Sequence, residues 1–159
     1  MSIDVRPASD RDAELLARLN RPVQELHVAG RPDYFKRVDA GAVATWFRSM
    51  LRKPAVRAWI ATFHGAPAGY ILTVTYDRAE NTFCGPRHFC EIDQIAVLSE
   101  FRRHGIARAL VEQVRHEARS RAIAEVELTS WSFNNEAHAA FCALGFSPRI
   151  VRYGRTSSP

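Results

Sequence analysis

Residues 91–110 of the chain read EIDQIAVLSEFRRHGIARAL, and this stretch decides most of what the sequence predicts about the fold. Its first half contains a short apolar run, Ile95, Ala96 and Val97, which is typical of a buried strand. An Arg- and Gly-rich turn follows, and an amphipathic helix begins near Ile106. This order predicts an anion site, because the first amides of a helix lack partners and carry partial positive charge.

The turn that opens this helix has the composition of a phosphate site. Gly105 lacks a Cβ, so ligand oxygens can approach the backbone closely, and small Ala107 leaves the first helical turn uncrowded. Three arginines can donate charge-assisted hydrogen bonds to phosphate oxygens, and His104 flanks them on the side expected to face solvent. We therefore expect a cradle for an anion such as a pyrophosphate. This phosphate cradle comprises Arg102, Arg103, His104, Gly105, Ile106, Ala107 and Arg108.

The spacing Arg-x-x-Gly-x-Ala over residues 102–107 resembles the acetyl-CoA signature of the GNAT acetyltransferase superfamily, Gln/Arg-x-x-Gly-x-Gly/Ala. IDQIAV, residues 92–97, resembles the strand that precedes the cradle in these enzymes. WSFNNEA, residues 131–137, and FCALGF, residues 141–146, are similar to the family elements W-x-F-N-x-x-A and F/Y-x-x-L-G-F. The chain is identified as a member of this superfamily, and the resemblance implies acetyl-CoA as co-substrate.

The resemblance and the hydrophobic pattern predict a mixed α/β fold, with a central, mostly antiparallel sheet and helices on both faces. Of the 159 residues, 47% are hydrophobic, which suffices for one domain over residues 1–153 and a disordered tail over residues 154–159. The expected strands cover residues 3–6, 56–63, 68–76, 89–97, 123–129 and 150–153. The expected helices cover residues 10–19, 41–51, 106–119 and 135–143, with a break at 20–22 and an irregular or helical piece over 23–28.

The strand expected at residues 89–97 does not keep a single hydrophobic face. Under regular alternation, Ile92 lies on one face and both Ile95 and Val97 lie on the other. A β-bulge would reconcile this pattern, and so would a strand buried on both faces.

Charge and composition argue against several other classes of function. The formal net charge of +5 permits an acidic partner, but the arginines outside the cradle are scattered, so we do not expect nucleic-acid binding. No apolar run reaches membrane-spanning length and no signal-peptide pattern is present, so we expect a cytoplasmic protein without membrane contact. The cysteines and histidines lack metal-site spacing, so no metal is expected. A homodimer is left open, because nothing in the sequence fixes the oligomeric state.

Acetyl transfer to an amine requires a group that removes the ammonium proton, whose pKa is about 10.4. Glu91 and Asp93 are the candidates, because strand residues two apart project from one face. Glu91 is preferred, since its longer side chain can reach an amine through a water molecule. The alternative is that one or both carboxylates only pair with an arginine such as Arg87.

The resemblance also implies co-substrate contacts outside the cradle. In the family, the backbone donors that polarise the thioester carbonyl come from the strand before the cradle, which here corresponds to Ile95, Ala96 and Val97. Asn134 matches the family's Asn on the pantetheine or diphosphate arm, and a helix cap is its alternative role.

Phe141 occupies a co-substrate position but departs from the family pattern. Many members place a Tyr there, which protonates the departing thiolate, and Phe lacks the hydroxyl. Either CoA leaves as a thiolate, or water supplies the proton, or another hydroxyl does so, with Tyr153 as the first candidate.

Residues 27–36 read HVAGRPDYFK and resemble an H-x-x-x-x-P-D-x-F-K element of one bacterial branch. His27, Arg31 and Phe35 are therefore the candidates for contact with the acceptor, and a tight turn packed by aromatic rings is the alternative. The leading hypothesis is an N-acetyltransferase that moves the acetyl group to a primary amine of a small molecule or peptide, by direct transfer in a ternary complex. The alternative is a catalytically weak acyl-CoA-binding sensor or regulatory module, which the absence of Tyr at position 141 would suit.

Overall fold

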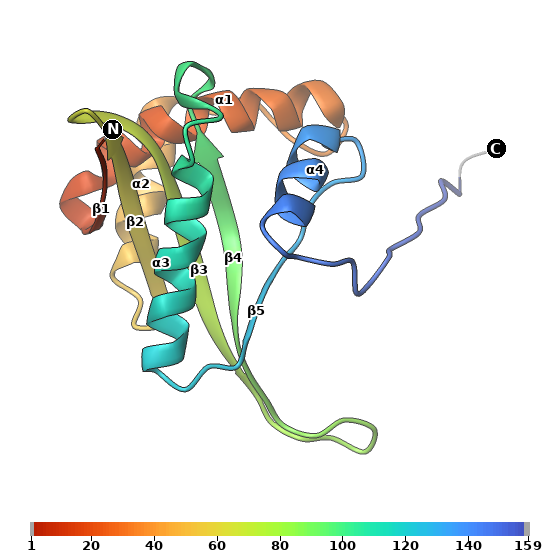
Figure 1. Ribbon diagram of the computed structural model, residues 1–159. Helices are drawn as coiled ribbons and strands as arrows, with labels where there is room; N and C mark the ends of the chain where they lie inside the picture. The colour runs from red at the N-terminus through yellow and green to blue at the C-terminus, as the bar shows by residue number, and fades with distance from the viewer. Residues whose placement is uncertain (1, 158–159) are drawn as a thin grey trace. The chain divides into compact units, whose positions relative to one another are not determined.

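The computed structural model describes residues 2–157 and forms two compact units, Met1–Thr129 and Ser130–Pro159. The first unit is a five-stranded sheet with three long helices, and the described residues of the second contain one helix (Figure 1). The single domain expected over residues 1–153 stays a prediction.

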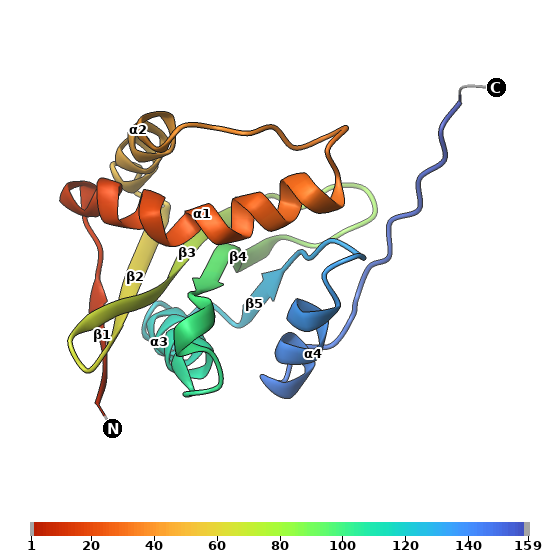
Figure 2. The ribbon, with the colours of Figure 1, turned by 90° about the horizontal axis from the view of Figure 1, so that it is seen from above.

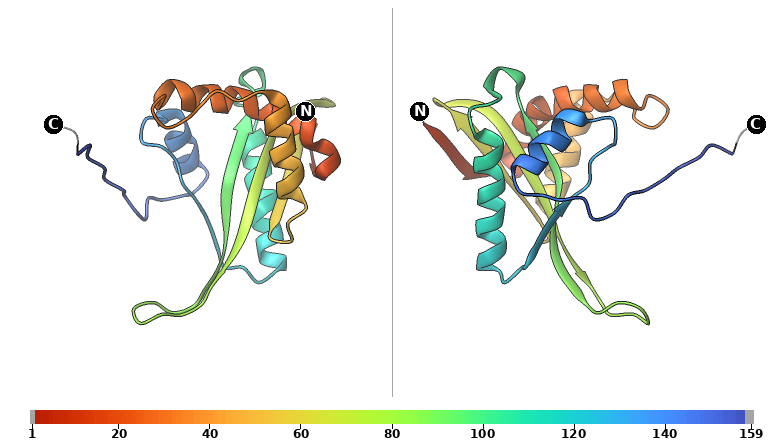
Figure 3. Two further views of the ribbon diagram at one scale, coloured as in Figure 1. Left: turned by 180° about the vertical axis from the view of Figure 1, so that it is seen from behind. Right: turned by 45° about the vertical axis from the view of Figure 1, so that its right-hand side comes forward.

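The sheet has the strand order β1-β2-β3-β4-β5, in which the first four strands pair antiparallel and β5 runs parallel to β4. The mixed, mostly antiparallel sheet expected from the sequence is therefore confirmed. The hairpin of β3 and β4 extends beyond the neighbouring strands (Figure 3). The strands are β1 (Ile3–Pro7), β2 (Val56–Phe63), β3 (Ala66–Arg78), β4 (Arg87–Val97) and β5 (Glu125–Leu128).

Helices cover both faces of the sheet, as expected (Figure 2). Alternate residues of β3 show this: Tyr70 and Leu72 are buried in one cluster with Phe47, beneath α1 and α2. Ile71 points to the opposite face, where α3 buries Leu110. The helices are α1 (Ala13–Gly30), α2 (Ala40–Leu51) and α3 (Ile106–Ser120), with short 3-10 helices η1 (Asp10–Asp12) and η2 (Ser99–Phe101).

A β-bulge in β4 explains the broken alternation of this strand. Leu72 of β3 lies opposite Gln94, and the next residue, Thr73, lies opposite Ile92, so Asp93 is the extra residue. Of the two explanations open at the sequence level, the bulge is the one the structure contains.

Gly69 allows β3 to approach the end of β4 closely. A Cβ at this position would lie 2.5 Å from the backbone oxygen of Ala96 and 3.2 Å from the Cα of Val97. Both are backbone atoms, which cannot move aside as a flexible side chain can, so a side chain here would force the strands apart.

The expected helix break at residues 20–22 is wrong, because α1 continues through Pro22 to Gly30. A proline inside a helix costs about 3 kcal/mol, since it removes one hydrogen bond and crowds the preceding turn. α1 nevertheless buries Leu16 and Leu19 against the sheet, and this packing outweighs the local cost.

The strand expected at residues 150–153 is also wrong, since residues 147–157 contain neither helix nor strand. Ile150 and Tyr153 are each 90% exposed. Alternating apolar residues form a stable strand only when another strand pairs with them, and no strand of residues 2–157 does so here. Of the expected disordered tail, residues 154–157 lack regular structure and residues 158 and 159 lie outside the described residues.

Candidate active site

The C-terminal half of β4 has a strand neighbour on one side only. β4 pairs with β5 as far as Ile92, which lies opposite Leu128, and beyond this point it pairs with β3 alone among the described residues. Figure 1 shows β5 diverging from β4. The half-buried residues Ile95, Ala96 and Val97 therefore present one backbone edge without a second strand. This is the segment that the sequence suggested for binding a carbonyl oxygen.

Two acidic side chains of β4 lie on the face covered by α1 and α2. Glu91 is opposite Val74, which packs against the core on that face. Asp93 interacts electrostatically with Glu91 and with the buried Tyr70. The bulge thus leaves both carboxylates on one face, near each other.

Burial makes both carboxylates better bases than usual, and like charge adds to this effect for Glu91. Burial raises the pKa of Glu91, and the carboxylates of Asp93 and Glu127 raise it further, while Arg78 lowers it. Burial also raises the pKa of Asp93. The Asp93 side chain reaches solvent, yet protein atoms crowd it closely enough to remove part of its hydration. A raised pKa favours proton acceptance nearer neutral pH.

Arg87 does not pair with either of these carboxylates. Its guanidinium donates hydrogen bonds to Glu125 and, at 3.0 Å, to Glu127, both on β5. The alternative role considered for Glu91 and Asp93 is an ion pair with an arginine such as Arg87. In the structure, Arg87 forms this ion pair with the two glutamates of β5 instead.

The phosphate cradle lies at the start of α3. Gly105 precedes the helix with φ +86°, a left-handed conformation that favours glycine. No side chain caps this helix start, and no acidic residue occupies its first turn. Among the described residues, a Cβ at Gly105 would meet only the Cδ1 of Ile3, at 3.8 Å, so the space beside Gly105 at this helix start is open. The backbone is thus arranged to accept an anion.

The side chains of the cradle are arranged around this helix start. Ile106 is buried and anchors the helix, and Ala107 is half-buried. The Nδ1 of His104 lies 3.3 Å from the backbone oxygen of Phe101, and its ring packs 4.7 Å from that of Phe63. The expected role of His104 as a flank of the cradle stays a prediction. The arginine side chains are exposed at Arg102, Arg103 and Arg108.

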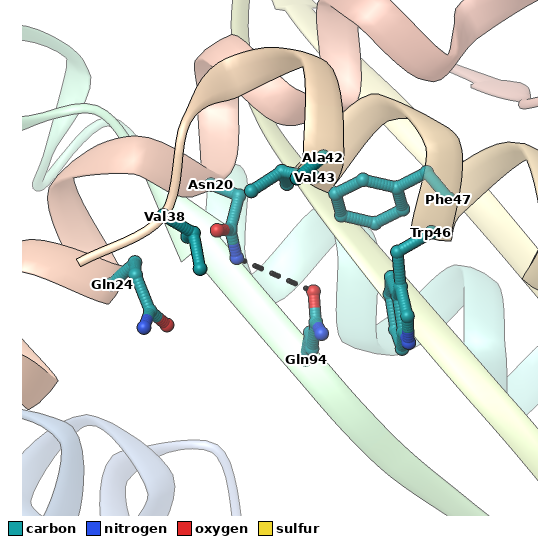
Figure 4. Close-up of a pocket in the computed structure, with 8 residues that line it drawn as sticks. All are labelled: Asn20, Gln24, Val38, Ala42, Val43, Trp46, Phe47 and Gln94. Atoms are coloured by element: carbon teal, nitrogen blue, oxygen red, sulfur yellow. Dashed lines mark hydrogen bonds between the residues drawn. The ribbon is translucent and has the colours of Figure 1, made fainter. Parts of the chain in front are cut away.

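A pocket of about 300 Å³ opens between α1, α2 and β4 (Figure 4). This volume is at the lower end of the range for small-molecule sites. Because Gln94 is the neighbour of Asp93 on β4, the pocket lies beside the acidic pair. It is lined by Asn20, Gln24, Val38, Ala42, Val43, Trp46, Phe47 and Gln94.

At the floor of this pocket, the lining side chains of Asn20 and Gln94 are joined in a hydrogen-bonded network through Tyr70, which lies beneath them and is fully buried. The Tyr70 hydroxyl donates to the Oε1 of Gln94 at 2.7 Å and accepts from the Nδ2 of Asn20 at 2.8 Å. The same Nδ2 is 3.4 Å from the Oε1 of Gln94. Sequence reasoning missed these residues, because Asn20 and Gln94 each stand beside a charged residue, Arg21 and Asp93, so no local pattern singles them out.

The residues expected to contact the acceptor lie at the C-terminal end of α1 and just after it. The ring of His27 stacks on Phe35 at 4.8 Å, and burial lowers the pKa of His27. Arg31 donates two hydrogen bonds to Asp33, at 2.8 and 2.7 Å. The turn packed by aromatic rings is thus present, whereas the pocket itself is lined by other residues of the described chain.

The second unit holds the remaining residues singled out in the sequence. The Oδ1 of Asn134 accepts a hydrogen bond from the Ala137 amide at 3.2 Å and caps α4 (Asn135–Ala143). Phe141 is half-buried, and its ring lies edge-on to Phe146 at 6.2 Å. Tyr153 is exposed, in the segment without regular structure.

Two classes of feature are not found within residues 2–157. None of the helices there combines the length and the apolar character needed to cross a membrane. Histidine, cysteine and acidic side chains do not gather there in any group of three suited to a metal ion.

The model of the acetyltransferase (GNAT) family matches residues 21–146, which include the cradle, the acidic pair and the pocket residue Gln94. The chain belongs to the GNAT acetyltransferase family. Its membership confirms the family assigned from the sequence motifs. Among curated proteins, none matches the chain significantly.

Solved structures of this fold cover nearly the whole chain. The BH1408 protein from Bacillus halodurans, as a tetramutant, has a TM-score of 0.91 at 19% identity, over 96% of this chain and 99% of its own. The aminoglycoside N-acetyltransferase AAC(6')-Iy in complex with CoA has a TM-score of 0.77 at 18% identity, over 99% and 96%. The ribosomal-protein-alanine N-acetyltransferase from Brucella melitensis biovar Abortus 2308 has a TM-score of 0.68 at 19% identity, over 98% and 99%. At these identities the likeness establishes the fold of this acetyltransferase.

Proposed function

We propose that this acetyltransferase uses acetyl-CoA to acetylate a primary amine of a small molecule or peptide, by direct transfer in a ternary complex. The observation that carries the proposal is the pair Glu91 and Asp93. Both carboxylates have a raised pKa, and both lie on the bulged strand that leads into the phosphate cradle. A base, a backbone edge and an anion cradle thus follow one another within residues 91–108.

The cradle residues fit the diphosphate of CoA. The open space at Gly105 leaves room for phosphate oxygens, and the uncapped amides of α3 can donate to them. Arg102, Arg103 and Arg108 add positive charge, and Asn134 is proposed to contact the pantetheine or diphosphate arm. When bound, acetyl-CoA supplies the acetyl group as a thioester.

The residues of β4 would perform the chemistry. An alkylammonium has a pKa of about 10.4, so it must lose a proton before it can attack a carbonyl. Glu91 takes this proton directly or through water, with Asp93 as the second base. Backbone amides of Ile95, Ala96 or Val97 donate to the carbonyl oxygen as negative charge develops on it.

If the departing sulfur is protonated, the proton comes from a group other than Phe141, which has no hydroxyl. Tyr153 and water are the candidates that the chain leaves, and departure as a thiolate needs neither.

The acceptor is proposed to enter through the pocket between α1, α2 and β4. Gln94, which lines this pocket, follows Asp93 on β4, so an amine bound in the pocket would lie close to the proposed base. His27, Arg31 and Phe35 would contact only a longer acceptor, beyond this pocket. One neighbouring structure contains a bisubstrate analogue of CoA and acetylneamine and another is a ribosomal-protein-alanine N-acetyltransferase, so both acceptor classes occur on this fold.

The test is release of CoA thiol from acetyl-CoA in the presence of a panel of amines, peptides and aminoglycosides, with the product identified by mass spectrometry. We expect thiol release that depends on the amine, together with an N-acetylated product. CoA binding without thiol release for any amine would instead support the sensor or regulatory module, which Phe141 favours.

A further inference from the structure

Among the described residues, those that line the pocket between α1, α2 and β4 include none with a charged side chain. Its lining combines apolar and aromatic groups from α2 and the preceding loop with three carboxamides, Asn20, Gln24 and Gln94. A cation that entered this pocket would lose water without finding a carboxylate in the lining to pair with, which is costly, because Glu91 and Asp93 lie beside the pocket and are not part of its lining. An uncharged polar group would lose water too, but could be compensated by hydrogen bonds to the carboxamides.

The network on the pocket floor fixes which hydrogen-bonding groups remain for a ligand. The Oε1 of Gln94 already accepts from Tyr70, so the amide nitrogen of Gln94 remains as a donor. The Nδ2 of Asn20 is bonded to the Tyr70 hydroxyl, so its Oδ1 remains as an acceptor. Figure 4 shows this Oδ1 turned away from Gln94. Because Tyr70 is fully buried, it holds both carboxamides in place.

The side chain of Gln24, which also lines the pocket, is held by a hydrogen bond too. Its Nε2 donates to the backbone oxygen of Lys36 at 3.0 Å, which leaves its Oε1 as a second acceptor. Trp46, 38% exposed, supplies a flat aromatic wall beside these groups (Figure 4). A planar group that carries both a hydrogen-bond donor and an acceptor could pair with these carboxamides and lie against the Trp46 ring. An amide is such a group.

From these contacts we propose that the pocket selects amines whose acceptor arm carries an uncharged amide, as a peptide does, over amines whose arm carries a second cation. This inference rests on the proposed N-acetyltransferase function and names the acceptor class for it.

The experiment compares two amines that differ in their arm. 4-Aminobutanamide carries a neutral carboxamide, and (3-aminopropyl)trimethylammonium carries a fixed cation that cannot itself be acetylated. Acetyl transfer is measured as kcat/KM for each, and binding to the enzyme–CoA complex is measured by calorimetry. We expect the amide to be favoured by at least about tenfold in both measurements.

Gln94→Glu tests the origin of this preference. A carboxylate at this position still accepts from Tyr70 and Asn20, so the network and the fold are retained, while the pocket gains a negative charge. The ratio of kcat/KM for the amide to kcat/KM for the cation should fall by about tenfold or more, and the ratio of their affinities should fall likewise. Gln113→Glu on α3 makes the same chemical change on the opposite face of the sheet and should leave the ratio unchanged.

The two readouts separate this inference from the function on which it rests. Tighter binding of the amide, shifted by Gln94→Glu, supports the pocket assignment even if no thiol is released, an outcome that would overturn the proposed function alone. Acetyl transfer with a preference for the cation, or no binding of either amine, would overturn the pocket assignment.

Discussion

Glu91 on β4 lies directly opposite Glu127 on the parallel strand β5. The two carboxylates repel each other, and this repulsion contributes to the raised pKa of Glu91. Glu127 in turn accepts a hydrogen bond from Arg87 at 3.0 Å. The proposed base is therefore coupled to a charge pair on the neighbouring strand.

This coupling predicts opposite pH shifts for two substitutions. Glu127→Gln removes a negative charge, so the pKa of Glu91 should fall and the acidic limb of the kcat profile should move to lower pH. Arg87→Gln leaves Glu127 without its partner, so the pKa of Glu91 should rise and the limb should move to higher pH. Both are measured by pH–rate profiles.

The control is the exposed pair Arg115 and Glu112 on α3, joined at 2.7 Å. Arg115→Gln and Glu112→Gln change the net charge in the same two ways at a different place. Shifts of the same size in these variants would show that net charge, and not the contact with Glu91, sets the profile.

Gly69→Ala should destabilise the sheet beside the proposed site. Its Cβ would lie 2.5 Å from the Ala96 oxygen, and relief requires the backbones of β3 and β4 to separate. We expect a loss of about 1–3 kcal/mol in the free energy of unfolding, measured in urea, and a lower kcat. Gly85→Ala, whose Cβ meets nothing within 4 Å, should change neither. Wild-type stability of Gly69→Ala would contradict the strand register.

Gly105→Glu should weaken CoA binding by orders of magnitude while the fold survives. The substitution places bulk and negative charge where the diphosphate is proposed to lie, and the site has room for the side chain itself. Calorimetry measures the affinity. Gly105→Ala separates the cost of the positive φ from that of the charge, and Gly85→Glu controls for net charge. An unchanged affinity in folded Gly105→Glu would exclude this cradle as the diphosphate site.

Phe141→Tyr should raise kcat if protonation of the departing thiolate limits the reaction. General-acid assistance is worth about 10²–10⁴-fold when fully positioned, so a partial fit remains measurable, and ionisation of the phenol should add a basic limb to the pH profile.

The double variant with Tyr153→Phe identifies any competing donor. If Tyr153 serves this step, Tyr153→Phe should be costly in the parent and milder beside Phe141→Tyr. A lower rate with intact CoA binding would show that the space around position 141 suits Phe and not Tyr. An unchanged rate in all variants would rule out a limiting proton transfer.

The sequence predicted the arrangement of β4, the cradle and α3 because each part has a strong local signal. Gly105 lies directly before α3, where the motif predicted the helix start, and the bulge at Asp93 resolves the broken alternation around Ile92. These features depend on residues close together in the chain, which a pattern can show.

Features that depend on distant contacts were not predictable in the same way. Pro22 indicated a break, but packing of α1 on the sheet maintains the helix. The pocket floor joins Asn20, Tyr70 and Gln94, which lie 50 and 24 positions apart, so no local pattern brings them together. Ile150 and Tyr153 alternate as a strand would, yet a strand also requires a partner.

The pH–rate profile of the variant Glu91→Gln with Asp93→Asn tests most directly whether these carboxylates are the base. In the wild-type enzyme, kcat for amine acetylation should fall as pH drops through a carboxyl pKa that lies above the usual range, because a protonated carboxyl cannot accept the amine proton. The double variant should lose this limb and about 10²–10⁴-fold in kcat, with CoA affinity retained. A double variant with the full rate and the wild-type profile would contradict the account, because solvent would then remove the proton.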